Sequence, residues 1–303
     1  MSPVLEYVKV SRSFKRGVPV LKDVSFSVGE GEVLGLLGRN GAGKTTLINI
    51  AIGLLYPGSG SVRVFGLSPT DHPVAVKQRI GYVQEEGTLR GGRTIRQLIA
   101  FYRGLFPKWD DGLEREILDR FGLTPKARIS RLSKGQRRQV ALMCAVCHRP
   151  ELLLLDEPAS GLDPAARREF LEAALLLLNR EGTTILFSSH QMNDVERLGG
   201  RMVLLGEGKV KLDREMDRVR EEIVLAVVPQ TSVSDAAVLE RIPGCLRVRA
   251  VRENWHAVVE GTPETVHDEL IRSLGRNDVR CARVPLEELF IELVGNSGRK
   301  EKA

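Results

Sequence analysis

A glycine-rich run near the N-terminus has the residue types and spacing that bind phosphate groups. Residues 38–45 read Gly-Arg-Asn-Gly-Ala-Gly-Lys-Thr and fit the pattern G-x-x-x-x-G-K-[ST]. The glycines let the backbone curl so that successive N–H groups point at phosphate oxygens, and a following helix adds the positive end of its dipole. In this pattern Lys44 reaches the β- and γ-phosphates, and the hydroxyl of Thr45 is a hard oxygen ligand suited to Mg²⁺.

A second run places two acidic side chains at the end of an apolar segment. Residues 152–157 read Leu-Leu-Leu-Leu-Asp-Glu. Four aliphatic residues predict a strand buried on both faces, and ligands bind at the carboxyl edge of such sheets. There, Asp156 would hold Mg²⁺ directly or through water, and Glu157 would orient or deprotonate an attacking water. Together with the glycine-rich run, these acids indicate a nucleoside triphosphate site rather than a solvated strand end.

The elements that must hold these residues alternate between short apolar runs and helical segments over residues 1–215. The predicted strands are Leu5–Val10, Val24–Val28, Val33–Leu37, Ser61–Phe65, Ile80–Gln84, Leu152–Asp156, Thr183–Ser188 and Met202–Leu205. The predicted helices that follow them are Lys44–Leu54, Pro164–Asn179 and Gln191–Leu198. This alternation predicts an α/β fold with a parallel sheet. A mostly helical insertion is expected over about residues 86–150, within segments 94–121 and 134–148.

The pattern changes after residue 215, and a smaller α+β domain is expected over residues 221–295. Its predicted strands and helices are Ile223–Val228, Asp235–Arg241, Leu246–Val251, Trp255–Glu260, Pro263–Leu274, Val279–Val284 and a closing helix at Leu286–Val294. The order β-α-β-β-α-β predicts a ferredoxin-like split βαβ unit. Trp255, Phe290 and Ile291 are expected in its core, and residues 296–303 are expected to form a flexible tail.

Composition narrows the possible classes. The chain has 45 Lys and Arg against 39 Asp and Glu, a formal charge of +6. A basic balance fits nucleic acid, an anionic membrane surface or simply a solvated face. No apolar run approaches the ~20 residues that a membrane-spanning helix needs, and no signal peptide is recognised. We therefore expect a cytoplasmic protein whose membrane role, if any, goes through a partner.

Two of the four cysteines lie in a short run that could be either a cofactor site or part of the core. Cys144-Ala-Val-Cys147-His148 has the spacing of a c-type haem attachment site. The run lies at the end of a predicted helix, where both cysteines share one face and behave as small core hydrophobes. A zinc or redox role would need a second pair of ligands, which the sequence does not supply. We therefore expect core packing rather than a cofactor.

Further short runs resemble the motifs of the ATP-binding cassette (ABC) ATPases. Residues 132–136, Leu-Ser-Lys-Gly-Gln, end 20 residues before Asp156 and resemble the family's signature, in which a second glycine usually stands where Lys134 is. Gln84 resembles the Q-loop, and residues 160–163, Ser-Gly-Leu-Asp, resemble the D-loop. His190 resembles the switch histidine, and an aromatic residue that stacks on adenine usually occupies the place of Phe14. The elements occur in family order across two-thirds of the chain.

This resemblance implies an ABC cassette, a P-loop NTPase fold with a parallel-sheet core, an antiparallel β subdomain and a helical insertion. It also implies an ATPase with the cofactors ATP and Mg²⁺. The implied catalytic residues are Lys44, Glu157 and His190, and the implied Mg²⁺ ligands are Thr45, Gln84 and Asp156. The implied nucleotide-binding residues are Phe14, Gly38, Arg39, Asn40, Gly41, Ala42, Gly43, Lys44, Thr45, Thr46, Gln84, Ser133, Gly135 and Gln136.

The resemblance further implies that two cassettes pair head to tail, with a homodimer favoured, and that the signature of one caps the ATP of the other. The helical insertion would grip a separate polytopic membrane permease at the inner face of the cell membrane. Lys134 departs from the family pattern. Its side chain could point outward without effect, or it could add positive charge near the phosphates, and both readings are open.

Residues 284–295 resemble the closing helix of drug, peptide and polysaccharide exporter subunits, and residues 106–110 resemble the antimicrobial-peptide export branch. These features favour an exporter subunit. One alternative is a soluble ABC ATPase that acts on ribosomes or nucleic acid. Such proteins carry two cassettes or long heptad arms, whereas one cassette is found here, so no direct nucleic-acid contact is expected. A purely regulatory binding module is disfavoured because every catalytic position is occupied.

Overall fold

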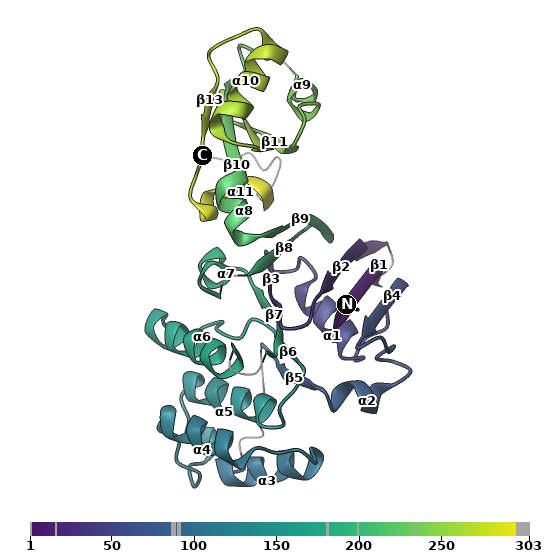
Figure 1. Ribbon diagram of the computed structural model, residues 1–303, viewed down its shortest axis with the longest axis vertical. Coiled ribbons are helices and arrows are strands. Elements are labelled where there is room, and N and C mark those ends of the chain that lie inside the picture. The colour runs from purple at the N-terminus through teal and green to yellow at the C-terminus, as the bar shows by residue number, and fades with distance from the viewer. Residues whose placement is uncertain are drawn as a thin grey trace.

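Three sheets organise the chain, and the largest carries the predicted strands of the α/β core (Figure 1). The computed structural model describes residues 2–15, 17–85, 89, 92–179, 182–198, 200–233 and 235–294. The six-stranded sheet has the order β5-β6-β7-β3-β8-β9, and every pair is parallel except β8 with β9. Its strands are β3 (Val33–Gly38), β5 (Ile80–Val83), β6 (Leu152–Leu155), β7 (Thr184–Ser189), β8 (Arg201–Gly206) and β9 (Lys209–Glu215).

Burial explains which of these strands were predictable. All four residues of β6 and all six of β7 are buried, as the aliphatic runs predict for central parallel strands. The edge strand β9 was not predicted, because its sequence Lys-Val-Lys-Leu-Asp-Arg-Glu is mostly charged and only Leu212 is buried. An antiparallel edge strand can face water on one side, so β9 carries a weak apolar pattern.

A three-stranded antiparallel sheet covers one side of this core, in the order β2-β1-β4. Its strands are β1 (Leu5–Lys15), β2 (Val18–Val28) and β4 (Ser59–Val64). β1 and β2 extend beyond the predicted segments because register shifts interrupt their alternation, and Lys9 and Asp23 have positive φ there. Side chains of this sheet, such as Leu5 and Val24, share a core with Leu36 of β3 and Ile48 of α1 (Lys44–Ala51).

The third sheet confirms the ferredoxin-like order expected for the C-terminal part. β10 (Ile223–Pro229), β11 (Cys245–Val251), β12 (Asn254–Glu260) and β13 (Arg280–Ala282) are arranged β11-β12-β10-β13, all antiparallel. α9 (Ala236–Glu240) and α10 (Pro263–Leu274) pack on one face. α8 (Met216–Glu222), which was not predicted, leads into the sheet from β9.

The other face of this sheet is covered by α11 (Leu286–Val294), which also contacts the α/β core (Figure 1). Leu289 and Leu293 of α11 share a cluster with Leu225 of β10 and with Val195 of α7 (Met192–Leu198). The expectation that Ile291 belongs to the core is wrong, because its side chain is 55% exposed. Instead the helix turns a carboxylate inward.

That carboxylate belongs to Glu292, which is 4% exposed. Arg249 of β11 donates two hydrogen bonds to it, one of them from Nη2 to Oε1 at 2.7 Å. His256 of β12 lies 3.0 Å from Oε1 through Nδ1. Burial alone would raise the pKa of Glu292, but these partners lower it below its ordinary value. A buried ion pair therefore fastens α11 to the sheet.

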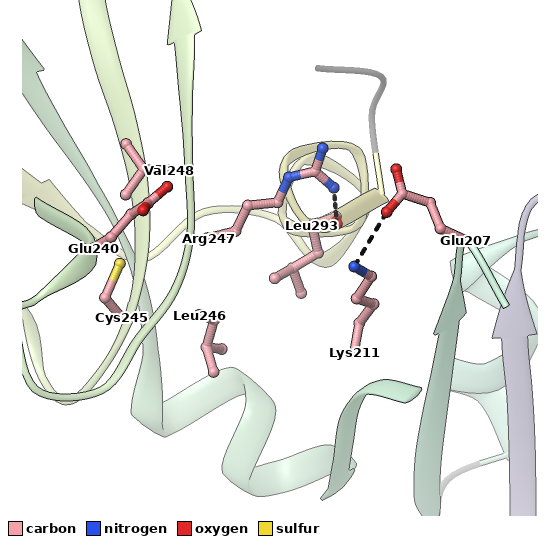
Figure 2. A pocket seen from close by; sticks show the side chains of 8 residues that line it. All are labelled: Glu207, Lys211, Glu240, Cys245, Leu246, Arg247, Val248 and Leu293. Carbon is pink, nitrogen blue, oxygen red and sulfur yellow. Dashed lines mark hydrogen bonds and ion pairs between the residues drawn. The ribbon is translucent and has the colours of Figure 1, made fainter. Parts of the chain in front are cut away.

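A polar cavity of about 380 Å³ separates β9 from β11 beside this helix (Figure 2). Its lining residues are Glu207, Lys211, Glu240, Cys245, Leu246, Arg247, Val248 and Leu293. Lys211 pairs with Glu207 at 3.4 Å, and Arg247 donates to the carbonyl of Leu293. Both acids and bases line the cavity, so it carries no net preference for a charged ligand.

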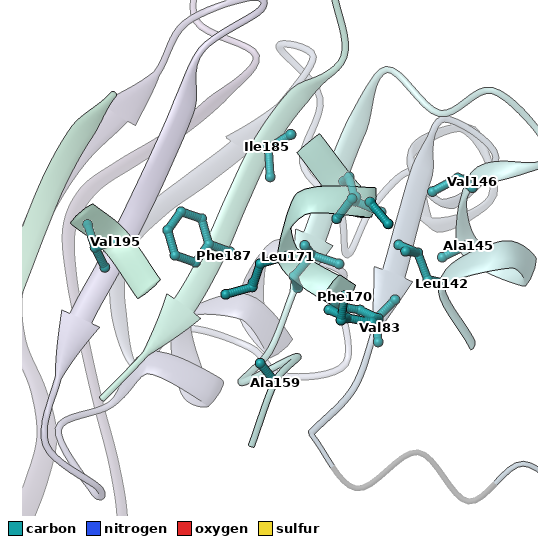
Figure 3. Packing of buried hydrophobic residues seen from close by; sticks show 14 of the residues in the cluster. Val83, Leu142, Ala145, Val146, Ala159, Phe170, Leu171, Ile185, Phe187 and Val195 are labelled. Atoms are coloured by element: carbon teal, nitrogen blue, oxygen red, sulfur yellow. The ribbon is translucent and has the colours of Figure 1, made fainter. Parts of the chain in front are cut away.

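The helical insertion confirms the predicted segments. α3 (Ile95–Leu105), α4 (Asp111–Arg120) and α5 (Lys134–Val146) begin at the side-chain caps Thr94, Asp110 and Ser133. α5 and α6 (Pro164–Asn179) pack apolar residues against β5, β6 and β7 (Figure 3). A short α2 (Pro73–Lys77) precedes β5. In the part of the chain that the structure describes, no helix has the length and apolar character needed to cross a bilayer.

Removing the buried carboxylate should undock α11. Glu292→Ala leaves the Arg249 guanidinium without its partner, so the free energy of unfolding should fall by about 3 kcal/mol. The check is a urea titration followed by Trp255 fluorescence in a Trp109→Phe background. Glu269→Ala, which breaks only the exposed pair with Arg272, should cost less than about 1 kcal/mol. Equal losses for the two variants would contradict the proposed fastening.

The same pair makes stability depend on pH. The folded-state pKa of Glu292 is lowered, so its contribution is present above the unfolded pKa and is lost as pH falls through the folded value. Glu292→Gln should therefore lose less stability than the wild type on acidification.

Candidate functional site

The phosphate loop joins β3 to α1 in a conformation that requires glycine at defined positions. Gly41 and Gly43 have φ of 81° and 108°, in the region that favours glycine. A Cβ on Gly43 would lie 2.5 Å from Cδ2 of Leu21, and a Cβ on Gly38 would lie 2.7 Å from the carbonyl oxygen of Leu205. The glycines of the pattern are thus needed for both curvature and close packing, as predicted.

Lys44 points back across this loop. Its Nζ donates to the carbonyl of Gly38 at 2.7 Å and pairs with Oε1 of Glu157 at 3.0 Å. Both side chains are only 5% exposed, so the ion pair is nearly removed from water. The structure therefore brings together the two residues that sequence analysis assigned to phosphate binding and to water activation, from elements 113 positions apart (157 − 44).

Asp156 lies fully buried immediately after β6. Its Oδ1 accepts hydrogen bonds from Thr45 Oγ1 at 3.2 Å and from Ser188 Oγ at 2.8 Å. Burial raises the pKa of Asp156 above its ordinary value, and these two hydrogen bonds oppose the rise. Among the described residues its second oxygen, Oδ2, has no hydrogen-bond partner. A buried carboxylate oxygen left over beside a threonine hydroxyl fits the oxygen ligands that Mg²⁺ prefers.

Glu157 is held on both sides. Its Oε2 lies 2.8 Å from Nδ1 of His190, opposite the pair with Lys44. Its backbone has φ of 44°, uncommon for a residue with a side chain, and its N–H donates to Ser188 Oγ at 2.8 Å. His190 follows β7 directly, so neighbouring strands supply the acid and the imidazole.

Two residues of this site were missed by sequence reasoning. Ser188 bridges Asp156 and the backbone of Glu157, and the only signal for it was a polar residue at the end of the apolar run in β7. Arg138 of α5 is buried and donates to the carbonyl oxygen of Gln84, which fastens the helical insertion to the end of β5. No motif marks a contact 54 positions apart in sequence.

Among the described residues, no hydrogen bond or ion pair joins Lys44 or Glu157 to the side chains of Phe14, Gln84, Ser133 or Gln136. Phe14 is 53% exposed near the end of β1, with the Arg12 guanidinium 5.2 Å from its ring centroid. The side chain of Gln84 is exposed. Ser133 and Gln136 close a capping box on one another at the start of α5, with hydrogen bonds of 3.1 and 3.0 Å. The polar side chains of the signature are therefore used to cap α5 in this chain.

The cysteine run lies in the core, as expected. Cys144 and Cys147 are 2% and 0% exposed, and burial raises the pKa of the Cys147 thiol to about 12. His148 stacks on Phe106 at 3.9 Å and lies 3.0 Å from the carbonyl of Ile80. Within the described residues no group of three His, Cys, Asp or Glu side chains is placed to hold a metal.

A phosphate loop between a buried parallel strand and a helix, facing an acid at the end of another strand of the sheet, defines a P-loop nucleoside triphosphatase. Comparison with known proteins identifies the family. The family described as "ABC transporter" matches residues 21–160. The ABC transporter ATP-binding protein YtrB of Bacillus subtilis is 32% identical over 284 residues, which span 93% of this chain and 96% of that protein. The chain belongs to the ABC transporter ATP-binding proteins, a family of ATPases.

Other relatives carry names that refer to export or to resistance. The Nod factor export ATP-binding protein I of Bradyrhizobium diazoefficiens is 32% identical over 98% of both chains. The linearmycin resistance ATP-binding protein LnrL of Bacillus subtilis is 35% identical over 63% of each. Among solved structures, an ATP-binding subunit of an ABC transporter is 31% identical with a TM-score of 0.65, over 72% of this chain and 92% of that chain.

A second solved structure has the same fold. It is a dimeric ATP-binding cassette in a post-hydrolysis state with ADP and phosphate. Its TM-score is 0.62 over 70% of this chain and 98% of that one, at 24% identity. These comparisons and the three sheets confirm the predicted cassette fold and the ATP-binding class.

Removing the bridging hydroxyl should weaken the site. Ser188→Ala leaves the Glu157 N–H without its acceptor and removes a donor from buried Asp156, so the free energy of unfolding should fall by about 1–3 kcal/mol. Urea denaturation measures the loss. Ser25→Ala, which removes an exposed acceptor of the Lys9 N–H, should cost about 0.5 kcal/mol or less. A Ser188 variant as stable as the Ser25 variant would contradict the bridging role.

Proposed function

We propose that this chain is the ATP-hydrolysing subunit of an ABC exporter, and that it acts as a head-to-tail dimer on a separate membrane subunit. The observation that carries the proposal is the position of Glu157 between Lys44 and His190, one residue beyond the buried Asp156. A carboxylate held this way at the end of a strand can accept a proton from a water molecule that attacks the terminal phosphate of ATP.

The residues of the site divide the reaction among them. Lys44 and the N–H groups of the phosphate loop bind the β- and γ-phosphates. Thr45 and Asp156, with Gln84, would hold Mg²⁺, which would supply positive charge to neutralise the phosphate oxygens. Water attacks the γ-phosphorus, its proton passes to Glu157, and the bond to the β-phosphate oxygen breaks, which releases ADP. His190 keeps Glu157 in place and contacts the γ-phosphate.

The Lys44–Glu157 ion pair suggests that nucleotide binding must come before water activation. Lys44 cannot pair with Glu157 at 3.0 Å and also bind phosphates in full, so nucleotide binding draws its ammonium away. One oxygen of Glu157 then becomes available to water. The carboxylate is thus neutralised until the phosphates arrive, which limits water activation to the loaded site.

A second copy of the chain completes the nucleotide site. The family resemblance assigns Ser133, Gly135 and Gln136 to nucleotide binding, and these residues lie in the first turn of α5 and at its cap. A Cβ on Gly135 would meet only ordinary contacts, with Ser133 Oγ at 3.8 Å and Leu162 Cδ2 at 3.9 Å. The fold of this chain does not itself demand glycine there, which supports close approach by a nucleotide on the partner cassette. ATP would stabilise the closed dimer because only ATP contacts both halves.

An apolar groove between the α/β core and the helical insertion supports docking of a membrane subunit. The groove has a volume of about 330 Å³ and is lined by Ile52, Leu54, Lys77, Ile80, Tyr82, Tyr102, Phe106, Cys144, Ala145 and His148. Among its lining residues, Leu54 is 59% exposed. A groove lined mostly by apolar side chains, one of them exposed, supports an interaction site. A partner segment from a polytopic permease would place this chain at the cytoplasmic face of the membrane.

The relatives named for export and resistance favour an exporter. A soluble ABC ATPase that acts on ribosomes or nucleic acid is the alternative, and the apolar groove favours a protein partner over nucleic acid.

We further propose that residues 1–215 form the cassette and that residues 221–295 form an accessory domain that regulates its dimer. α11 contacts α7, where Asn193 donates to Glu287 at 2.9 Å, and α7 begins two residues after His190. Contact between α11 and α7 can therefore affect the position of His190, the switch histidine. Glu292→Ala, by undocking α11, should change the ATP concentration needed for dimerisation.

Replacing the proposed base separates binding from hydrolysis. Glu157→Gln keeps the side-chain shape but cannot take the proton, so ATP should still bind while turnover falls by about 100-fold or more. Size exclusion with ATP and Mg²⁺ should show a stable dimer, and phosphate release measures turnover. Lys126→Met, at an exposed lysine of the helical insertion, serves as the surface control. Wild-type turnover in Glu157→Gln would show that another group is the base.

The membrane partner can be identified with the same variant. Tagged Glu157→Gln protein, isolated with ATP and Mg²⁺ from detergent-solubilised membranes of its host, should bring down a polytopic membrane protein in near-equal amount. Leu54→Asp, which puts a charge in the groove, should abolish this. Val238→Asp, at a 42% exposed apolar residue of α9, should not. Recovery of ribosomes or nucleic acid instead would favour the soluble alternative.

A further inference from the structure

Lys134, the departure from the family signature, lies against the D-loop of its own chain. The position of a Cβ on Gly161 would lie 2.1 Å from Nζ of Lys134 and 3.2 Å from its Cε. The lysine side chain thus occupies the space that any side chain at residue 161 would take. Gly161 also has φ of +67°, a conformation that favours glycine, and a side chain at residue 161 would displace the end of Lys134.

This contact joins two segments that serve the reaction. Lys134 follows Ser133, the capping residue of the signature helix. Gly161 belongs to the turn that follows Glu157 in the chain. In this turn the N–H of Ser160 donates to the carbonyl of Glu157 at 3.0 Å. The ammonium of Lys134 therefore lies against a residue, Gly161, that follows the proposed base by four positions in the sequence.

The ammonium of Lys134 is exposed and lacks an acidic partner in the described part of its own chain. Lys134 is exposed, and among the described residues its ammonium has no hydrogen bond or ion pair. Asp163, the acid of the same turn, accepts from the N–H groups of Ala165 and Ala166 at the start of α6 instead. A lysine held over a glycine turn with no acid of its own suits an anion brought by another molecule.

We propose that Lys134 binds the γ-phosphate of the ATP held by the phosphate loop of the second copy. The inference rests on the proposed head-to-tail dimer, in which the signature of one copy caps the nucleotide of the other. The turn at Gly161 supports the ammonium from below, and the position usually filled by glycine supplies a cation across the interface. Lys134 and Gly161 therefore act as a pair.

The test measures ATP-driven dimerisation of Glu157→Gln with further substitutions at residue 134. Lys134→Met keeps the length and removes the charge, so it should raise the half-maximal ATP concentration about tenfold at about 50 mM salt. Lys134→Arg keeps the charge and should stay within about threefold of the parent. The difference should shrink at about 500 mM salt, because screening weakens the contact. Lys126→Met, on an exposed lysine of the insertion, is the matched control and should match the parent.

A second measurement separates the cross-subunit contact from local damage. Binding of a fluorescent ATP analogue to dilute monomer should be unchanged in Lys134→Met, because the proposed contact is with the nucleotide of the partner and not with that of its own chain. Gly161→Ala should weaken dimerisation by displacing Lys134. Combined with Lys134→Gly, it should cost less than the sum of the single effects, because the double variant has no lysine for the new Cβ to displace.

Other outcomes would overturn the assignment. Equal dimerisation of the parent and Lys134→Met would show that the charge of Lys134 does not contribute to dimerisation. Equal weakening by Lys134→Met and Lys134→Arg would show that the shape of the side chain matters and its charge does not. Weaker monomer binding in Lys134→Met would place the lysine in its own site. Failure of Glu157→Gln itself to dimerise with ATP would instead reject the head-to-tail dimer, and the role of Lys134 with it.

Discussion

Burying two carboxylates at the end of one strand is the constraint on which the rest of the site depends. Asp156 and Glu157 are 0% and 4% exposed, and a carboxylate withdrawn from water is costly unless donors or cations compensate it. The compensation comes from other elements: Lys44 from α1, Ser188 from β7, and His190 from the segment after it. The parallel sheet holds these elements in fixed register, so the charge balance of the site depends on the order of its strands.

The parts of the site that sequence could predict are those in which one short run carries its own geometry. The phosphate loop needs its glycines for local curvature, and Asp156 follows four aliphatic residues that can only form a buried strand. Ser188 and Arg138 could not be found in this way, because their partners lie 32 and 54 positions away and nothing in the adjacent sequence marks them. Contacts between distant segments depend on the packing of the whole sheet.

The C-terminal sheet is a second example in which contacts between distant segments could not be predicted from sequence. The run in β10 is apolar on both faces, and the structure covers one face with α9 and α10 and the other with α11. Hydropathy alone predicted Ile291 in the interior and did not mark Glu292, whereas the fold exposes Ile291 and buries Glu292. The reason lies in residues of other strands, Arg249 and His256, which give the buried carboxylate its partners. A helix can be predicted from its own periodicity, but the face that it buries depends on its neighbours.

Because α11 follows in sequence every element that it covers, its place in the core has a consequence during synthesis on the ribosome. The apolar surfaces of α7 and β10 are complete before α11 has been translated, yet Leu289 and Leu293 are what shields them from water. Until then the nascent chain cannot bury these apolar surfaces against α11, and exposed apolar surface favours aggregation. The contact between α11 and the two elements can therefore form only after the closing helix has left the ribosome.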